Sequence, residues 1–417
     1  MNLNDTPEHV EFRRRARAWI DDNAPWSKVQ TLRNLRHGGQ PVTETRWIEL
    51  AKQWQRAKYD AGWACLVWPR EHGGGGLGPR ENVIFQEEEG FFAELFGPFM
   101  IGQGFIAPTL MAYATAEQQA ELLPRLASGE EIWCQLFSEP GAGSDLAGIR
   151  SRAERTDDGR WRVNGQKVWT SGAQYSDWGL AVLRTEPSLP KHKGLTVFMV
   201  PMDTPGITIQ PIRQLGGGSH FNAVHFDDVT LPDSWRVGPV NDGWRVALTT
   251  LMNERMTLGA SIGIGFDEIF ELARRADAHG RRPIESRHVR LRLADWYAID
   301  RALHHGVYRS LETLEAGGSP GPELSVGKLV GATATQDIAA FGLDLLGERA
   351  RTAGDIGSDP WTMQTMFAFG AVHRVEGGTD EILRNIIAER VLGLPPEHRA
   401  DVGPFRDIPT APRKKGQ

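Results

Sequence analysis

The spacing of apolar residues changes twice along this chain, and that change limits the folds it can adopt. In residues 1–131, apolar positions recur at helical spacing, as over residues 7–20. Residues 132–240 instead carry short alternating runs separated by turn residues, and the helical spacing returns over 241–395. The pattern predicts a helical domain, a β domain and a second helical domain, followed by a tail over 396–417.

Local start and stop signals divide the two helical parts into separate helices. Thr43 with Glu44 opens one helix, and Thr115 with Gln118 has the pattern of a capping box before another. Glycine-rich breaks follow Glu71 and Ala316. Helices are expected over residues 7–20, 43–59, 80–96, 101–113, 242–279, 284–316, 323–346, 362–371 and 379–391, with one more beginning at 115.

The middle part, residues 132–240, has the turn residues and short strand-like runs of a compact β domain. Asp158-Gly159 and Asn164-Gly165 are dipeptides typical of hairpin turns. Strand-like runs cover residues 161–165, 167–170, 180–183, 195–200, 207–210 and 223–226.

Composition excludes several classes of protein. The net charge of −6 over 417 residues includes no dominant basic stripe, so no nucleic-acid partner is expected. Cys65 and Cys134 have no metal or redox spacing, and two cysteines in so long a chain favour a reducing compartment. The charged N-terminus does not fit a signal peptide, and no run approaches 18 apolar residues. We expect a cytoplasmic protein with no metal, no membrane span and a solvated end over 409–417.

Two short motifs in the β part carry candidate ligand-binding residues. Residues 134–145 read C-Q-L-F-S-E-P-G-A-G-S-D, a turn whose backbone N–H groups suit a pyrophosphate or the polar edge of a flavin. Residues 165–173 read G-Q-K-V-W-T-S-G-A, which offers an aromatic face at Trp169 beside hydroxyl groups. Each motif alone also fits a purely structural role, as a glycine-rich turn or a core tryptophan.

The order and spacing of these motifs resemble the acyl-CoA dehydrogenase family over about residues 60–395. The resemblance rests on S-E-P-G-A-G-S-D followed by N-G-Q-K-V-W-T-S-G, with G-W-A-C-L-V-W-P-R-E-H-G-G-G-G-L-G and L-L-P-R-L-A-S-G-E before them. After them come G-L-T-V-F-M-V-P-M-D-T-P-G-I-T-I, F-N-A-V-H-F-D-D-V-T-L-P, V-N-D-G-W-R-V-A and R-N-I-I-A-E-R-V-L-G-L-P. Together the set is highly specific, although no single piece is.

The resemblance implies an α+β multidomain fold with an N-terminal all-α domain, a middle β-barrel-like domain and a C-terminal four-helix bundle. Family members bind FAD, form homodimers or homotetramers, and oxidise an acyl-CoA thioester to the 2,3-enoyl-CoA. Their electrons pass to an electron-transferring flavoprotein. The chemistry needs a buried carboxylate to remove the α-proton, a flavin to accept hydride from the β-carbon, and donors for the thioester oxygen.

The resemblance also assigns cofactor and substrate contacts in the first motif. Gln135, Phe137 and Ser138 align with residues that line the flavin, with Ser138 near its N5 and O4 edge. Gly143 and Ser144 align with positions near the pyrophosphate and the pantetheine arm of CoA.

Further assignments come from the second motif and the C-terminal part. Trp169 and Ser171 align with residues that pack against and hydrogen-bond the flavin ring. Thr379 and Glu381 align with residues at the phosphate and adenosine end of the cofactor. The family motif R-x-x-F-G, whose arginine reaches a neighbouring subunit's cofactor, is replaced from Arg275 by R-A-D-A-H-G and leaves that role unassigned.

The identity of the catalytic base depends on register. Aligning Gly378-Thr379 with the family's E-G-T motif puts Gly377 at the base position, so Glu376 lies one residue early. One residue is a rotation of about 100° on a helix, which disfavours Glu376. The family's second base position follows a G-W pair, and Glu254 occupies it here with Arg255 beside the acyl-CoA channel or in a structural role.

Three functions remain open at this point. The leading one is an acyl-CoA dehydrogenase that uses Glu254. The second is a non-catalytic or site-sharing subunit of a hetero-oligomer, which the glycine at 377 and the altered arginine motif suggest. The third is an oxidase or flavin monooxygenase, which no residue favours. The acyl group is also open, from straight-chain to branched or steroid-derived.

Overall fold

The computed structural model divides into two compact units. The helical unit comprises Met1–Gly97 and Arg255–Leu394, and the β unit comprises Pro98–Glu254 and Pro395–Gln417. The predicted domain boundaries at residues 131, 240 and 395 stay predictions. The structure describes residues 5–28, 43–261, 264–275, 280–318, 321–352, 354, 358–397, 401 and 403–408. The predicted solvated end, 409–417, lies outside these residues.

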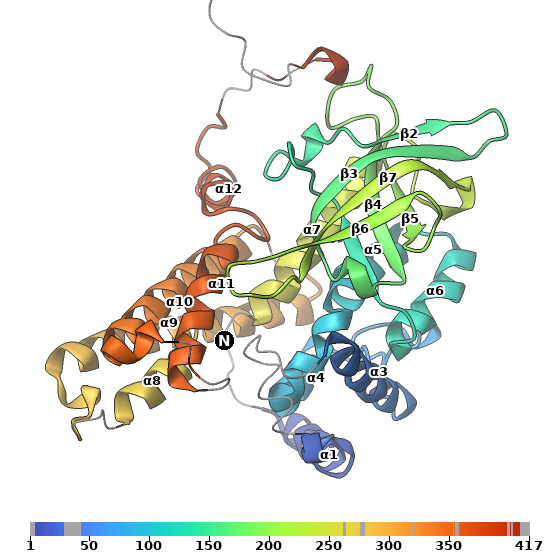
Figure 1. The fold of residues 1–417 in the computed structure, drawn as a ribbon. Coiled ribbons are helices and arrows are strands. Elements are labelled where there is room, and N and C mark those ends of the chain that lie inside the picture. The colour runs from blue at the N-terminus through green and yellow to red at the C-terminus, as the bar shows by residue number, and fades with distance from the viewer. Residues whose placement is uncertain are drawn as a thin grey trace, which may run out of the picture. The chain divides into compact units, whose positions relative to one another are not determined.

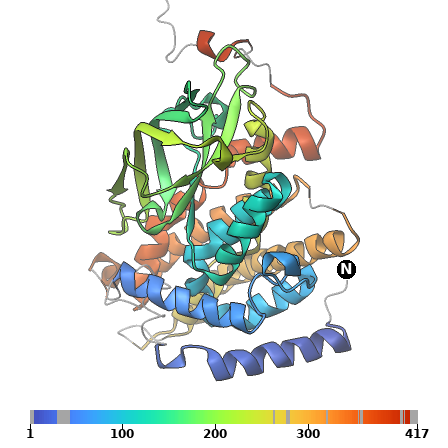
Figure 2. The same ribbon diagram turned by 90° about the vertical axis from the view of Figure 1, so that its right-hand side faces the viewer.

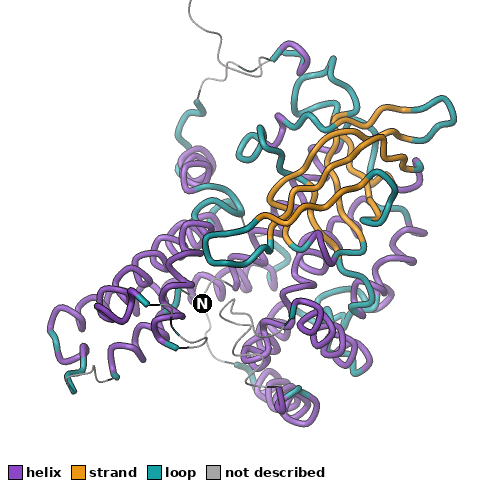
Figure 3. Tube along the Cα trace, viewed as in Figure 1, coloured by secondary structure: helices purple, strands orange, loops and turns teal. Residues whose placement is uncertain are grey.

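The β unit contains an eight-stranded sheet among its described residues. Its strand order is β6-β7-β3-β2-β4-β5-β8, and β1 pairs with β4 in parallel. Figure 1 and Figure 3 show the strands curving together. The strands are β1 (Trp133–Leu136), β2 (Arg152–Arg155), β3 (Trp161–Ser171), β4 (Trp178–Arg184), β5 (Leu195–Pro201), β6 (Ile207–Ile212), β7 (Phe221–Leu231) and β8 (Arg236–Val237).

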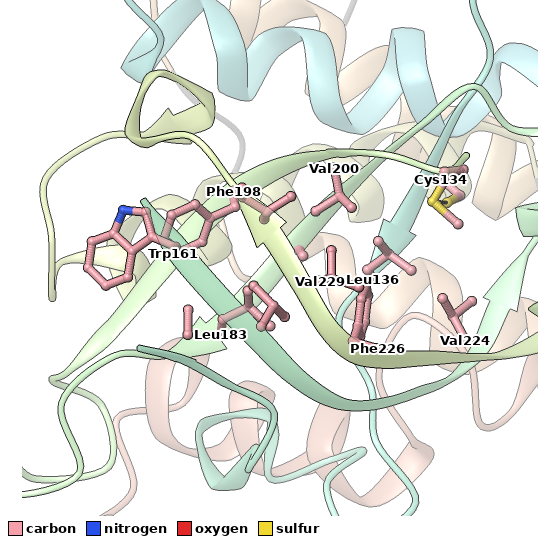
Figure 4. Packing of buried hydrophobic residues seen from close by; sticks show 14 of the residues in the cluster. Cys134, Leu136, Trp161, Leu183, Phe198, Val200, Val224, Phe226 and Val229 are labelled. Carbon is pink, nitrogen blue, oxygen red and sulfur yellow. Dashed lines mark hydrogen bonds between the residues drawn. The ribbon is translucent and has the colours of Figure 1, made fainter. Parts of the chain in front are cut away.

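Continuous apolar runs explain why the centre of this sheet is buried. In β4 and β5 nearly every residue is buried, which fits strands covered on both faces. Their side chains join a core that Figure 4 shows at close range, including Trp161, Phe198 and Phe226. The indole of Trp161 and the ring of Phe198 pack edge to face at 5.3 Å. The predicted middle β domain is confirmed.

One predicted turn is wrong. Asn164-Gly165 was expected to close a hairpin, but both residues lie inside β3, where the pairing with β7 shifts between Val163 and Gly165. A β-carbon at Gly165 would lie 2.3 Å from the Ser151 hydroxyl oxygen, so the glycine allows close approach of the residue before β2 rather than a reversal of the chain.

Helices adjoin the sheet within the β unit. The helix α6 (Ala116–Ser128) begins with the predicted capping box, in which the Thr115 hydroxyl accepts from the backbone of Gln118 and the Gln118 side chain accepts from that of Thr115. Before it lie a π-helix over Met100–Ile106 and α5 (Ala107–Tyr113). The helix α7 (Gly243–Ser261) follows the sheet and contributes its residues up to Glu254 to this unit.

Among the residues that the structure describes, one helical stretch satisfies the length and composition of a membrane span. It covers Phe92–Tyr113, and 56% of its most apolar window is buried inside the protein. A buried core helix meets the same criterion, so the finding is weak evidence for a membrane. The absence of a span and the cytoplasmic location stay predictions.

The helical unit confirms the expected N-terminal and C-terminal helical parts. Figure 1 and Figure 2 show the N-terminal helices, coloured blue, lying next to one another. The helices α8 to α11 surround a core that includes Ile269, Trp296, Ile338 and Met363. The helices are α1 (Pro7–Asn23), α3 (Glu44–Asp60), α4 (Pro79–Glu89), α8 (Phe266–Arg274), α9 (Arg287–Glu315), α10 (Leu324–Leu346), α11 (Asp359–His373) and α12 (Asp380–Ile386).

The expected helix over 242–279 is two helices. The first, α7, ends at Ser261, and the second, α8, begins at Phe266. Gly265 precedes α8 with a φ of +78°, a left-handed conformation that glycine adopts without strain and that interrupts helical hydrogen bonding. A β-carbon there would also lie 2.1 Å from the terminal carbon of Met366.

Candidate active site

A buried ion pair fixes the turn of the first motif. The Glu139 carboxylate accepts from the backbone N–H groups of Arg150 at 2.6 Å and Ser151 at 2.9 Å. It also accepts from the Lys167 ammonium group at 2.8 Å. Burial alone would raise the pKa of Glu139, but the Lys167 charge and these donors hold the pKa below its ordinary value. These bonds therefore hold the start of the turn in place at Glu139.

Lys167 ties that turn to two strands. Its side chain is fully buried, and its ammonium group also donates to the backbone carbonyls of Phe137 at 3.0 Å and Val182 at 2.8 Å. Burial lowers the pKa of Lys167, and the neighbouring carboxylate opposes that shift. Neither residue of this pair is among those predicted from the sequence to form the site. The signal was present, because Lys167 is the only charged residue of the second motif and Glu139 is one of two charged residues in the first.

Trp169 is exposed rather than part of the core. It lies on β3 where the pairing with β7 is interrupted between Lys167 and Thr170, and its φ is +60°. A left-handed conformation is uncommon for a bulky residue and costs on the order of 1–2 kcal/mol. The indole is 59% exposed and meets the Phe221 ring edge to face at 6.1 Å. Strained backbone and an exposed aromatic face together favour a ligand-contact role.

Polar groups lie next to Trp169 along β3 and on the segment bonded to it. The backbone N–H of Val168 donates to the Ser138 carbonyl at 2.9 Å, which joins the first motif to the second. Ser138 and Ser171 are half-buried, and the buried hydroxyl of Thr170 has no hydrogen-bond partner among the described residues. An exposed aromatic face beside hydroxyl and carbonyl groups fits the flat ring and polar edge of a flavin.

The glycine-rich end of the first motif is open. Gly143 and Ser144 are exposed, and a β-carbon built at Gly141 or Gly143 would meet no atom within 4 Å. The backbone of this turn is therefore accessible to a ligand. The surrounding protein atoms would leave room for a side chain at Gly141 and Gly143, so close packing does not require glycine there.

Glu254 contacts the first motif. The Gln135 side-chain amide donates to the Glu254 carboxylate at 3.4 Å, and both side chains are half-buried. The same helix, α7, is joined to α5 by paired hydroxyl groups, Thr250 with Thr109 at 3.0 Å and Thr249 with Tyr113 at 3.1 Å. These bonds lie one turn before Glu254 and fix the rotation of α7.

Glu376 points toward its own helix. Its backbone N–H donates to the Val372 carbonyl at 2.9 Å, which continues the turn of α11. One carboxylate oxygen lies 2.6 Å from Nδ1 of His373. Gly377 and Gly378 follow with φ values of +58° and +102°, so the turn that extends α11 beyond His373 ends directly after Glu376.

The segment after Glu376 is held by two further contacts. The Lys328 ammonium group donates to the Gly378 carbonyl at 2.6 Å, and Arg374 pairs with Asp380. Thr379 caps α12 by accepting from the Ile382 backbone at 3.3 Å, and Glu381 is exposed in the first turn of that helix.

Within the β unit, Gln135 contacts Glu254, and the Ser138 carbonyl bonds the backbone of Val168, the residue before Trp169. Phe137 is buried, and Ser171 lies two residues after Trp169 on β3. Thr379, Glu381 and the half-buried Arg255 belong to the helical unit. Among the described residues, no group of three His, Cys, Asp or Glu side chains could hold a metal ion.

Comparison with known proteins gives three family-model matches in the order of the predicted parts. They are the N-terminal domain of acyl-CoA dehydrogenase over residues 6–130, the middle domain over 134–229 and the C-terminal domain over 241–392. The acyl-CoA dehydrogenase IpdE1 of Mycobacterium tuberculosis is 39% identical over 93% of this chain and 98% of its own length.

The fold is also similar to solved structures of acyl-CoA dehydrogenases. The "Tcur3481-Tcur3483 steroid ACAD" has a TM-score of 0.79 at 28% identity, covering 95% of this chain and 100% of its own. A chain of the ChsE4-ChsE5 complex from Mycobacterium tuberculosis has a TM-score of 0.78 at 32% identity, also covering 95% and 100%.

Proposed function

Because the chain belongs to the acyl-CoA dehydrogenase family of FAD-dependent oxidoreductases, we propose that it converts an acyl-CoA thioester to the 2,3-enoyl-CoA. The observation that carries this proposal is Glu254, a carboxylate that accepts a hydrogen bond from the Gln135 amide of the first motif. The reaction removes one proton from the α-carbon and one hydride from the β-carbon of the substrate.

Glu254 is the proposed base. One of its carboxylate oxygens takes the α-proton, and the other remains close to the Gln135 amide, which orients the group through hydrogen bonding. Bound FAD supplies the acceptor for the hydride. Glu376 is less suited to the role, because its carboxylate is engaged with His373 and the register places Gly377 where the family has its base.

Two groups of residues are proposed to hold the cofactor. Gln135, Phe137, Ser138, Trp169 and Ser171 offer an aromatic face and polar groups to the ring system. The accessible backbone of the first motif would receive the pyrophosphate region. In the β unit, the proposed contacts of that region are Gly143 and Ser144, and Ser144 is also proposed to contact the acyl-CoA. For the helical unit by itself, the family resemblance proposes Thr379 and Glu381 as cofactor contacts and Arg255 as an acyl-CoA contact.

The proposed substrate is a thioester with a bulky, ring-bearing acyl group. Its support is the similarity to a structure described as a steroid acyl-CoA dehydrogenase at 28% identity. Straight-chain and branched thioesters are the comparison set. An electron-transferring flavoprotein is the proposed acceptor of the electrons.

The test is an anaerobic titration of purified holoenzyme with a panel of acyl-CoA esters, including a steroid-derived thioester. The expected result is loss of visible FAD absorbance together with formation of a product two mass units lighter. Reoxidation should be fast with electron-transferring flavoprotein and slow with oxygen. Rapid reoxidation by oxygen would instead support an oxidase, and no loss of absorbance with any thioester would contradict the proposed substrate class.

A second candidate is a site-sharing subunit of a hetero-oligomer. The glycine at 377 favours it, as does similarity to a chain from the ChsE4-ChsE5 complex. Such a subunit purified alone should contain no FAD, or FAD that no thioester reduces.

A further inference from the structure

The chain returns to the β unit at its C-terminal end. Residues 401 and 403–408, called the C-terminal strap from here on, lie against the loop between β4 and β5. The backbone N–H of Phe405 donates to the Leu189 carbonyl at 2.8 Å, and that of Arg406 donates to the Pro187 carbonyl at 2.9 Å. An isolated β-bridge joins Pro190 to Pro404. These contacts fix the register of the strap.

The Phe405 side chain is the hydrophobic anchor of the strap. It is 5% exposed, and the Arg184 guanidinium carbon lies 3.8 Å from the centre of its ring. Arg150 lies at 5.0 Å from the same centre. Such distances are within the range of cation–π attraction, which is stronger where the cation is shielded from water. Burial lowers the pKa of Arg184 to about 10.

Arg184 connects the strap to the first motif. Its guanidinium group donates to the Ala147 carbonyl at 2.7 Å, two residues after the G-A-G-S-D sequence. It also donates to the carbonyls of Lys191 at 2.9 Å and Lys193 at 2.8 Å in the β4–β5 loop. One arginine therefore joins the turn, the loop and the aromatic ring of the strap.

A second connection is electrostatic. The Lys191 side chain is 5% exposed, and its ammonium group bonds both Asp145 and Asp401. Asp145 is the last residue of the G-A-G-S-D sequence, and it lies 2.8 Å from the ammonium group. A buried cation needs such partners, so the strap carboxylate helps to keep Lys191 beside the turn.

We propose that the C-terminal strap is a positioning element for the turn that carries Gly143 and Ser144, and that it sets the affinity for the CoA thioester. The role of that turn in binding CoA rests on the proposed function. Glu139 and Lys167 hold the start of the turn, and Gly141 and Gly143 have open space around them, so the far end of the turn is held at Asp145 and Ala147, where the strap acts. A turn held in place before binding loses less conformational entropy when the ligand arrives.

The test compares Phe405→Ala and Asp401→Asn with a matched control, Asp407→Asn. Asp407 carries the same charge in the same strap but is 67% exposed and pairs only weakly, at 4.0 Å, with Arg406. Two quantities are measured on the full-length holoenzyme. The first is hydrogen–deuterium exchange of the amides in residues 139–150, and the second is the dependence of the anaerobic rate of FAD reduction on thioester concentration.

The expected result is faster exchange over residues 139–150 and a Kd for the thioester raised about five- to tenfold in Phe405→Ala. The limiting rate of reduction should change less than about twofold, because Glu254 is not disturbed. Asp401→Asn should raise the exchange rate and the Kd by a smaller factor. Phe405→Tyr, which keeps an aromatic ring, should have the exchange rate and Kd of the wild type, and so should Asp407→Asn.

Unchanged exchange and unchanged Kd in Phe405→Ala and Asp401→Asn would overturn the proposal. So would an equal effect of Asp407→Asn, or a fall in the limiting rate at constant Kd. If no thioester reduces the wild type, the proposed function fails, and the exchange of residues 139–150 together with titration of CoA itself still decides whether the strap positions the turn.

Discussion

Trp169 is better explained by ligand binding than by a contribution to the stability of the fold. The side chain is 59% exposed and its backbone is left-handed, so neither burial nor local conformation rewards a tryptophan there. We predict that Trp169→Ala lowers the affinity for FAD about two- to tenfold, the value of one aromatic stacking contact. Fluorescence titration of apoprotein with FAD measures the change.

The control for Trp169 is another exposed apolar side chain of the β unit. Leu215 is 90% exposed in the connection between β6 and β7, and Leu215→Ala should leave FAD affinity unchanged. Both variants should unfold at the same urea concentration as the wild type within error. Equal FAD affinity in Trp169→Ala and wild type would remove the indole from the proposed cofactor site.

The buried pair of Glu139 and Lys167 has the opposite character, because its loss should damage the fold. Glu139→Gln leaves the fully buried Lys167 charge without its carboxylate, and we predict a loss of about 3–5 kcal/mol in the free energy of unfolding. Glu154→Gln is the control, because Glu154 pairs with Arg162 at 3.3 Å on the surface and should cost less than about 1 kcal/mol. Urea unfolding followed by tryptophan fluorescence measures the free energy of unfolding of both variants. Equal losses in Glu139→Gln and Glu154→Gln would show that the buried pair does not stabilise the fold more than a surface pair does.

The same pair predicts an acid dependence. Because the pKa of Glu139 lies below its ordinary value of 4.5 in the folded protein, its contribution to stability is present above that value. The contribution disappears as the pH falls through the lower, folded pKa. The difference in urea midpoint between wild type and Glu139→Gln should therefore narrow below about pH 4.5. A difference that stays constant down to pH 3 would show that the carboxylate charge is not what stabilises the turn.

At the residue scale, the two motifs were readable from the sequence, whereas their surroundings were not. Hydroxyl groups, glycines and a tryptophan at fixed spacing indicate ligand contact. The left-handed backbone of Trp169 depends on a bulge between β3 and β7, which involves residues far apart in the chain. The pairing of Glu139 with Lys167 likewise needs the fold.

The start of α7 is the element whose placement matters most for Glu254. A β-carbon at Gly243 would lie 2.7 Å from the Cα of Thr196 and 2.8 Å from the carbonyl of Leu195, both backbone atoms of β5. We predict that Gly243→Ala forces α7 away from β5, lowers stability by about 1–3 kcal/mol and slows FAD reduction by the thioester. Thermal unfolding and single-turnover rates measure the two effects.

The matched control is a glycine with open space inside a helix. Gly306 lies in α9, is exposed, and a β-carbon there would meet nothing within 4 Å. Gly306→Ala should raise stability by about 0.5–1 kcal/mol and leave the rate alone. A stable and fully active Gly243→Ala would mean that the close contact with β5 does not set the position of Glu254.

At the element scale, prediction succeeded where caps and breaks are local. The ends of α9 and α10 lie within three residues of those expected, because breaker residues frame both helices. Prediction from the sequence failed where an element depends on a contact with residues far away along the chain. Asn164-Gly165 is a bulge rather than a turn because β3 continues along β7, and nothing local in the strap indicates that Phe405 packs on Arg184.

At the scale of the whole molecule, the order of helical, β and helical parts followed from periodicity alone. Subunit number did not, because assembly depends on surface complementarity that one chain does not specify. We predict that native mass spectrometry of the purified protein finds a homodimer or homotetramer with FAD bound. A protein that purifies without FAD, and gains it only with a second, different chain, would support the hetero-oligomer instead.

The central claim is that Glu254, not Glu376, is the base. The most direct measurement follows the visible absorbance of FAD anaerobically as a reactive acyl-CoA ester is added to wild type, Glu254→Gln and Glu376→Gln. We predict that wild type and Glu376→Gln lose the absorbance, while Glu254→Gln binds the thioester and keeps it. If Glu376→Gln alone keeps the absorbance, the base lies at the end of α11 and the assignment of Glu254 is wrong.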